Sequence, residues 1–137
     1  MSYLLDTNVI SELRRGERAH PGVTAWFAEL ADEEIFLSVL TIGEIRRGIE
    51  SVRRRDPDSA ATLDRWLALL SDAHGDRILS IDRTITEEWG RMNVPDPLPV
   101  VDGMLAATAR VLGLTLVTRN VADVKGTGVE LLNPFEA

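Results

Sequence analysis

The sequence predicts an α/β protein, a three-layer α/β/α sandwich with a central parallel sheet of four or five strands. Short apolar runs rich in Leu, Ile and Val alternate with amphipathic stretches that are long enough for helices. Strands joined by such helices pair in parallel, and the helices cover both faces of the sheet. A chain of 137 residues supports one hydrophobic core and is short for two. We therefore expect residues 1–137 to form a single domain.

Each predicted strand is a short apolar run bounded by polar or turn-forming residues, as is typical of a strand that is buried on both faces. The first run leads into Asp6 and the third into Asp82, two residues that favour the start of a helix. The expected strands are residues 3–5, 35–37, 78–81 and 114–118, with a short fifth strand at 129–132.

The predicted helices carry start and stop signals. Gly16 follows the first helix, Pro21 begins the second, and Asp56-Pro57-Asp58 separates the third from the fourth. A proline-rich loop at residues 95–99 precedes the last helix. The expected helices are residues 8–15, 21–31, 41–54, 59–71, 82–92 and 101–112.

Four acidic residues lie close to the ends of these strands. Asp6 directly follows the first strand, and Glu44 falls in the first turn of the helix after the second strand. Asp102 opens the helix before the fourth strand, and Asp123 comes just after that strand. Ligands of open α/β sheets bind beyond the carboxyl ends of the strands, so these residues are expected to converge on one edge of the sheet.

Helix capping is an alternative explanation for each acidic residue taken singly. Asp and Glu favour the first turn of a helix, where they accept backbone hydrogen bonds. Thr41-Ile42-Gly43-Glu44 fits a capping box, which would account for Glu44 completely. Asp6-Thr7-Asn8 would also make a good helix start. Capping therefore stays open for each of them.

Asp102 is the hardest of the four to explain in this way. It lies between Val100-Val101 and Gly103-Met104-Leu105, in an apolar part of the sequence. Burying a lone carboxylate costs several kcal/mol unless it is paired or bound to a metal. A cluster of carboxylates without a lysine among them favours Mg²⁺ or Mn²⁺. This donor set is suited to phosphodiester hydrolysis.

The composition disfavours other kinds of site. There is no cysteine, which excludes disulfides, thiol catalysis and thiolate metal ligands. His20 and His74, the only histidines, lie in polar surroundings, so any metal would be held by oxygen. The sequence has no basic leader with a long apolar stretch and no apolar run near the roughly 18 residues of a membrane span. We therefore expect a cytoplasmic protein that does not enter a membrane.

The charge is negative overall but uneven. A net charge of −7 argues against a broad electrostatic contact with duplex nucleic acid. Five arginines nevertheless fall within residues 46–55. They could hold a phosphate backbone, or they could form a solvated helix face in which Glu50 pairs with Arg46 and Arg54. The sequence leaves both interpretations open.

Several motifs, taken together and in order, resemble a known family. They are LLDTNVISEL at the start, SVLTIGEIRRGI after the second strand, VVDGMLAATARVLGLTLVTRN, and then VADV. This series is similar to the PIN-domain ribonucleases, and in particular to the VapC/FitB-type toxins of bacterial toxin–antitoxin pairs. The resemblance covers almost the whole chain. It implies a metal-dependent endoribonuclease that acts on structured RNA such as tRNA or rRNA.

The resemblance also implies roles for individual residues. Asp6, Glu44 and Asp102 match the family positions that hold Mg²⁺ or Mn²⁺. The fourth acidic role is carried to Asp123, because Asn120 stands where the family often has an acidic residue directly after Thr-Arg. Asn120 is then a possible neutral helper. We expect single-step hydrolysis that leaves a 5′-phosphate and a 3′-hydroxyl.

Two threonines lie next to the acidic positions. Thr7 follows Asp6, and Thr118 ends the fourth predicted strand. Their hydroxyl groups are expected to orient carboxylates or the attacking water. The resemblance also makes RNA or antitoxin contacts by Arg46 and Arg47 about as plausible as a solvated face.

A member of this family is expected to have a protein partner. The partner implied by the resemblance is a VapB-like antitoxin, whose C-terminal segment blocks the active site with a basic side chain. Ile10, Leu13, Trp26 and Phe27 offer one wall of an apolar groove for it, although such residues more often belong to a plain core. A homodimer is expected, and a larger hetero-oligomer with the antitoxin is possible.

Two other functions compete with the ribonuclease hypothesis. A non-catalytic PIN-fold module that binds RNA or protein is disfavoured because the three core acidic residues are present. A phosphotransfer domain also has an aspartate after its first strand. It is disfavoured because Asn8 replaces the second aspartate of a phosphatase motif, and because Lys125 is the only lysine available to a receiver domain.

Overall fold

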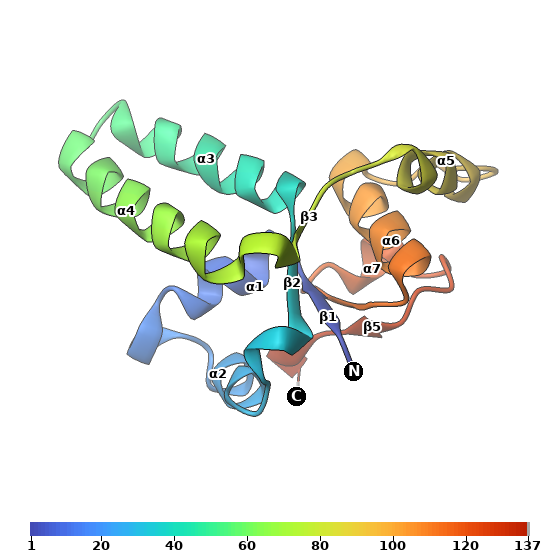
Figure 1. Cartoon of the computed structure of the whole chain (residues 1–137), viewed down its shortest axis with the longest axis horizontal. Coiled ribbons are helices and arrows are strands. Elements are labelled where there is room, and N and C mark those ends of the chain that lie inside the picture. Colours follow the sequence, from blue (N-terminus) through green and yellow to red (C-terminus); the bar gives the residue numbers. More distant parts are fainter. Residues whose placement is uncertain (137) are drawn as a thin grey trace.

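A parallel sheet of five strands forms the middle layer of the fold, in the order β3-β2-β1-β4-β5. The computed structural model describes residues 1–136. The predicted α/β class with a parallel sheet flanked by helices is confirmed (Figure 1). The strands are β1 (Tyr3–Leu5), β2 (Ile35–Ser38), β3 (Ile78–Leu79), β4 (Thr115–Val117) and β5 (Leu131–Leu132).

Helices pack against both faces of this sheet. One hydrophobic core contains residues from α1 (Thr7–Leu13), α2 (Pro21–Ala28), α3 (Val39–Arg53) and α4 (Pro57–His74). The second core contains residues from α6 (Val100–Leu112) and α7 (Val121–Val124), and α5 (Arg83–Met92) packs on α6. The sheet is thus the middle of three layers.

The side chains of the central strands explain why there are two cores. Leu5 pairs with Val117 across β1 and β4, and both lie in the core that includes α1 and α3. Leu4 pairs with Leu116 one position earlier, and both lie in the core that includes α6. Successive side chains of a strand point to opposite faces, so apolar residues at consecutive positions fill both cores.

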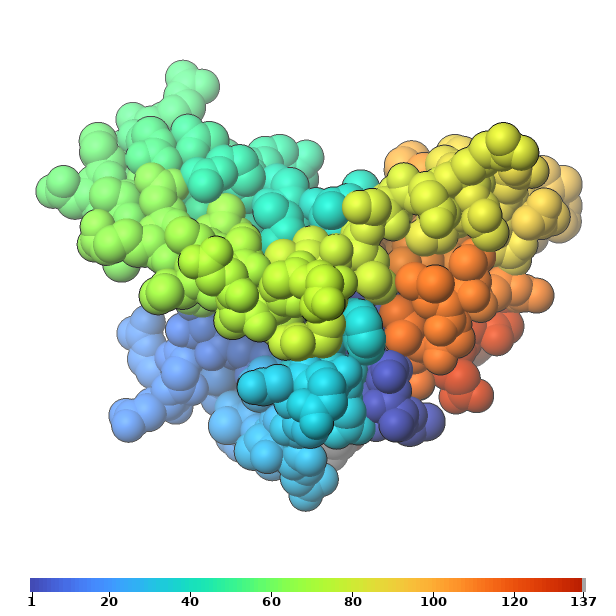
Figure 2. Space-filling view, viewed as in Figure 1, coloured from blue at the N-terminus to red at the C-terminus, as the bar shows by residue number. Residues whose placement is uncertain are grey.

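Two pairs of helices extend beyond the carboxyl edge of the sheet. α3 packs along α4, and α5 packs on α6, and Figure 1 shows the two pairs on opposite sides of the central strands. In the space-filling view they form two lobes with a hollow between them (Figure 2). Within residues 1–136, no helix is both long enough and apolar enough to pass through a membrane.

The boundaries of several elements differ from the sequence prediction by a few residues. α3 begins at Val39 rather than at residue 41, because the hydroxyl group of Ser38 caps it by accepting a hydrogen bond from the Leu40 N–H at 3.1 Å. α4 begins at Pro57 rather than at residue 59, because Asp56 caps it and proline fits the first helical position. The strand expected at 78–81 is shorter and ends at Leu79.

Candidate active site

Asp6 lies where β1 leaves the sheet, and its carboxylate is almost completely buried, with 5% of the residue exposed. It caps α1, because its Oδ1 accepts a hydrogen bond from the Thr7 N–H at 2.7 Å. Its other oxygen accepts one from the Thr118 hydroxyl at 2.8 Å. Burial nevertheless raises the pKa of Asp6 above its ordinary value, although both hydrogen bonds act in the opposite direction. Asp6 therefore caps α1 with a carboxylate whose charged form is disfavoured by burial.

Glu44 is not a capping residue. Because α3 begins at Val39, Glu44 lies in the second turn of the helix rather than in the first as predicted, and the capping box with Thr41 that was left open does not form. Thr41 is buried inside the helix, and its hydroxyl has no hydrogen-bond partner among residues 1–136. The Glu44 carboxylate instead accepts a hydrogen bond from the Thr7 hydroxyl. This contact links Glu44 to Thr7, the residue that directly follows Asp6.

Asp102 lies in the first turn of α6, as predicted, and is partly buried. Its environment raises the pKa from 3.8 to about 6, chiefly through burial and then through the negative charges of Asp6, Asp123 and Glu44. The dependence on these three charges means that all four predicted acidic residues lie at the same edge of the sheet. We call Asp6, Glu44, Asp102 and Asp123 the acidic edge.

Asp123 and Asn120 belong to the short helix α7 and its N-cap, an element that was not predicted from the sequence. Asp123 is exposed in the first turn of α7. Asn120 occupies the N-cap position, but its side chain makes no capping hydrogen bond. Its backbone N–H donates to the Thr118 hydroxyl at 2.9 Å. Thr118 therefore links the α7 turn to Asp6, which supports the expectation that its hydroxyl orients a carboxylate.

Asn8 is a residue of this site to which the sequence assigned no role in orienting the carboxylates. Its Oδ1 accepts a hydrogen bond from the Arg119 N–H at 3.2 Å, and its Nδ2 donates to Asp6 at 3.4 Å. The side chain thus connects α1 with the segment after β4. The spacing Asp-Thr-Asn was the available signal, because it places Asn8 in the first turn of α1, two residues from Asp6.

The acidic edge has no internal counterion. Within residues 1–136, no arginine, lysine, histidine or N-terminal amine forms an ion pair with any of its carboxylates. In the same part of the chain, no three Asp, Glu, His or Cys side chains already converge as a set of metal ligands. Mg²⁺ is often held by one or two carboxylates and several waters, so it does not need three converging side chains. The oxygen donors and their uncompensated charge therefore fit a divalent cation.

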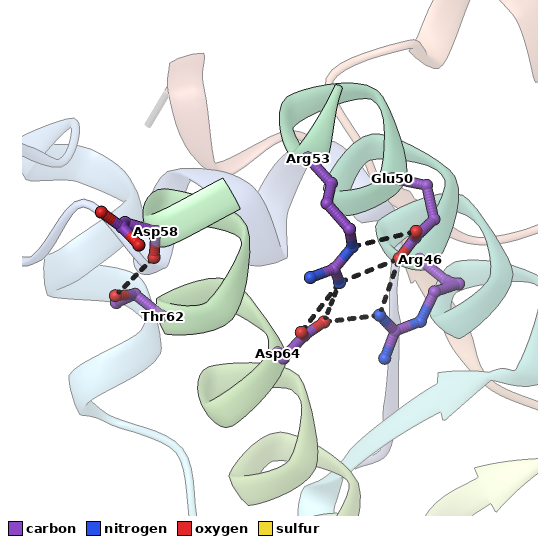
Figure 3. Close-up of polar contacts among 6 residues, drawn as sticks. All are labelled: Arg46, Glu50, Arg53, Asp58, Thr62 and Asp64. Carbon is purple, nitrogen blue, oxygen red and sulfur yellow. Dashed lines mark hydrogen bonds and ion pairs between the residues drawn. The ribbon is translucent and has the colours of Figure 1, made fainter. Parts of the chain in front are cut away.

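The arginines of α3 are in a different situation. Arg46 pairs with Asp64 at 2.6 Å and with Glu50 at 3.2 Å. Arg53 pairs with Glu50 at 3.0 Å and with Asp64 at 2.8 Å, which joins α3 to α4 (Figure 3). The expected pair of Glu50 with Arg46 is confirmed, but its second partner is Arg53 rather than Arg54. We call Arg46, Glu50, Arg53 and Asp64 the ion-pair cluster.

Arg46 and Arg47 thus differ as candidate contacts for RNA or an antitoxin. The guanidinium group of Arg46 is engaged within the ion-pair cluster. Arg47 is exposed and forms no ion pair within residues 1–136. Arg47 is the better placed of the two to meet a partner.

The amino-acid sequence is similar to those of known proteins. Plasmid stability protein StbB from Pseudomonas syringae pv. tomato is 33% identical over 142 residues, with 98% of this chain and 99% of that protein covered. Ribonuclease VapC14 from Mycobacterium tuberculosis is 44% identical over 66 residues, which are 48% of this chain and 63% of that protein. The similarity to StbB spans almost the whole chain, and so includes the segments that carry the acidic edge.

The fold is also similar to that of solved structures. A chain in the crystal structure of FitAcB from Neisseria gonorrhoeae matches with a TM-score of 0.90 and 28% identity, covering 98% of this chain and 99% of that chain. Residues 3–122 match the family described as the PIN domain, a range that contains Asp6, Glu44 and Asp102. The resemblance predicted from the motifs is therefore confirmed. This chain belongs to the PIN-domain family.

Proposed function

We propose that this chain is a metal-dependent endoribonuclease, the toxin of a VapBC-like toxin–antitoxin pair, which hydrolyses phosphodiester bonds in structured RNA such as tRNA or rRNA. The observation that carries this proposal is the acidic edge, four carboxylates at the carboxyl ends of parallel strands without an internal counterion. The similarity to a relative named as a ribonuclease, VapC14, supports the same activity.

Asp6, Glu44 and Asp102 would hold Mg²⁺ or Mn²⁺, with Asp123 and Asn120 as the outer residues of the site. A bound divalent cation supplies an activated water and neutralises the charge that develops on the phosphate. The chain's own contribution is to hold the ligands in place. Thr118 and Asn8 fix the orientation of Asp6, and Thr7 holds Glu44. The acidic edge contains neither a histidine nor a cysteine, so the proposed hydrolysis uses a metal held by oxygen ligands alone.

The partner in this proposal is an antitoxin whose C-terminal segment brings a basic side chain to the acidic edge. An apolar pocket of about 140 Å³ between α1, α2 and α4 is available for the rest of that segment, and Ile10, Leu13 and Phe27 line it. Trp26, the fourth residue of the expected wall, instead packs edge-to-face on Tyr3 at 5.4 Å between ring centroids. It belongs to the core rather than to this pocket. A homodimer and a larger complex with the antitoxin remain part of the proposal.

The test is RNA cleavage by the wild type and by Asp6→Asn with Mn²⁺ present, followed by mapping of the new RNA ends. We expect 5′-phosphate ends with the wild type and no cleavage with Asp6→Asn. Asp72→Asn is the matched control, because Asp72 is an exposed aspartate in the last turn of α4 and is not a member of the acidic edge. Equal cleavage by the wild type and Asp6→Asn would contradict the proposal.

The alternative is a non-catalytic PIN-fold module that binds RNA or protein. It predicts that the wild type cleaves no RNA with either Mn²⁺ or Mg²⁺, while RNA or a protein partner still binds. The acidic edge disfavours this alternative. Burial raises the pKa values of Asp6 and Asp102, and such perturbed carboxylates are typical of catalytic sites rather than of plain binding surfaces.

A further inference from the structure

A groove of about 200 Å³ lies beside the acidic edge, between α1, α3 and α4. Thr7 and Glu44 line it, and both also belong to the candidate active site. The groove therefore continues from the place where a phosphodiester bond is proposed to react. Ligand pockets for complete small molecules usually measure roughly 300–1,000 Å³, so this groove suits one unit of a larger ligand.

Gly48 is a residue of this groove that the chain's own packing does not require. It lies in the interior of α3, where glycine is the least favourable residue apart from proline. A Cβ atom at this position would meet nothing within 4 Å apart from the adjoining backbone of its own helix. Since Gly48 lines the groove, any side chain there would stand in it. The bare backbone keeps this space open.

Arg14 supplies positive charge at the groove. Its guanidinium carbon lies 5.7 Å from the centroid of the Trp66 ring, and both residues line the groove. Within residues 1–136 Arg14 forms no ion pair, whereas Arg46 and Arg53 are engaged by carboxylates. An arginine held against an aromatic ring keeps its outer N–H groups available for a phosphate.

Apart from Ser11 of α1, the remaining lining is apolar, and we call it the apolar floor of the groove. It consists of side chains from α3 and α4, namely Ile45, Ile49, Val52, Leu63 and Trp66. A base can cover such a surface while its flanking phosphates meet polar groups. The groove thus offers both an apolar surface for a base and a positive charge for a phosphate.

Resting on the proposed function, we propose that this groove binds the nucleotide next to the scissile phosphate, with its base on the apolar floor and its phosphate at Arg14. A peptide side chain is the competing occupant. Two observations favour RNA: the groove is continuous with the acidic edge, and its unpaired arginine matches a phosphate in a chain whose net charge is −7.

The experiment compares two substrates, a labelled random-sequence RNA of about 12 nucleotides and bis(p-nitrophenyl) phosphate, which is too small to reach along the groove. Gly48→Met fills the groove and favours the helix. We expect it to lower kcat/KM for the RNA by about tenfold or more and to leave hydrolysis of the small ester within about twofold of the wild type. Its Tm should be no lower than that of the wild type. Gly90→Met is the control, because Gly90 is an exposed helical glycine with open space around it on α5.

Arg14→Gln tests the phosphate contact separately. We expect it to raise KM for the RNA by about threefold to tenfold while kcat changes little, as for a contact made equally in the ground state and the transition state. Arg83→Gln is the matched control, since Arg83 is an exposed arginine of α5.

The outcomes separate the groove from the proposed function. RNA cleavage that is unchanged in Gly48→Met overturns the groove assignment, even if that variant loses its response to a protein inhibitor. Failure of the wild type to hydrolyse either substrate with Mn²⁺ refutes the proposed function instead. In that event fluorescence anisotropy with the same RNA tests the groove. Equal affinity of the wild type and Gly48→Met overturns it, and about tenfold weaker binding by Gly48→Met supports it.

Discussion

Two regions of the molecule gather charged side chains, and they treat those charges in opposite ways. In the ion-pair cluster, Arg46 and Arg53 of α3 meet Glu50 and Asp64, and every charge has a partner (Figure 3). Hydrogen bonds from Arg53 and then Arg46 hold the pKa of Asp64 below its ordinary value. In the acidic edge the pKa of Asp102 is instead raised to about 6. The charges of the ion-pair cluster are balanced within the chain, whereas the carboxylates of the acidic edge require a counterion that the chain does not supply.

Hydrogen bonding and ion pairing also separate the two regions. The carboxylates of the acidic edge accept hydrogen bonds from neutral groups, such as the hydroxyls of Thr7 and Thr118, which orient them without neutralising them. The ion-pair cluster is solvent-exposed, so its ion pairs are screened and contribute modestly to stability. The comparison predicts large functional effects at the acidic edge and small structural effects at the cluster.

The largest expected effect is on RNA cleavage. We expect Asp102→Asn to lower the cleavage rate by about a hundredfold or more, because it removes a proposed metal ligand. Asp64→Asn, which removes a carboxylate from the ion-pair cluster, should change the rate by no more than about twofold. Initial rates on one labelled RNA at fixed Mn²⁺ measure both. Similar losses in the two variants would erase the distinction between the regions.

The next prediction concerns the start of α3, which determines whether the Glu44 side chain takes part in capping that helix. Ser38→Ala should lower the free energy of unfolding by about 1 kcal/mol, since the Ser38 hydroxyl caps α3. Thr41→Val should cost little or stabilise the protein, since the Thr41 hydroxyl is buried without a partner. Urea denaturation of both variants is the measurement. A larger loss for Thr41→Val than for Ser38→Ala would restore the capping box.

The raised pKa of Asp102 predicts that Asp102→Asn stabilises the protein in a pH-dependent way. The pKa of Asp102 is higher in the folded protein than its ordinary value of 3.8, so the folded state binds more protons between about pH 4 and pH 6. Stability therefore falls as pH rises through this window, and Asp102→Asn removes that loss. Without metal, the variant should be more stable than the wild type by about 1 kcal/mol at pH 7.5, after allowing for solvent screening.

At pH 4 the same substitution should give almost no gain, because Asp102 is then protonated in the folded state and close to its titration midpoint in the unfolded chain. Denaturation curves at the two pH values, with and without Mg²⁺, provide the comparison. Mg²⁺ should shrink the advantage of the variant at pH 7.5, because a bound cation stabilises the wild type. A wild type that is the more stable protein at pH 7.5 without metal would show that the charge of Asp102 is compensated.

The smallest effect is expected at the ion-pair cluster. Asp64→Asn leaves Arg46 and Arg53 with Glu50 alone. We expect a fall in Tm of no more than about 3 °C at low salt, and a smaller one in about 1 M NaCl, where exposed ion pairs are screened. Thermal denaturation at the two salt concentrations measures it. A large, salt-independent fall would mean that the cluster resembles a buried site.

The sequence was sufficient for the architecture and for the membership of the acidic edge. Apolar runs and helix signals predicted the five strands, and their parallel pairing brings residues distant in sequence, such as Asp6 and Thr118, into contact. The start of α3 was predicted incorrectly, because Ser38 and Thr41 are both good caps by residue type. The structure shows that Ser38, the last residue of β2, is the one that caps the helix.

Other details depended on tertiary contacts that no local pattern reveals. Glu50 has arginines four residues away on both sides, but Arg53 lies toward Asp64 on α4 and takes the place expected for Arg54. The role of Asn8 also depends on a partner 111 residues away in sequence, the backbone of Arg119. Such contacts depend on how helices pack and strands pair, which no local pattern specifies.

Calorimetric titration with Mn²⁺ at pH 7.5 tests most directly whether the acidic edge exists to hold a cation. The wild type should bind Mn²⁺ at a saturable site, and Asp6→Asn should lose that binding while keeping a cooperative unfolding transition. Equal binding by both proteins, or no binding by the wild type, would contradict the account.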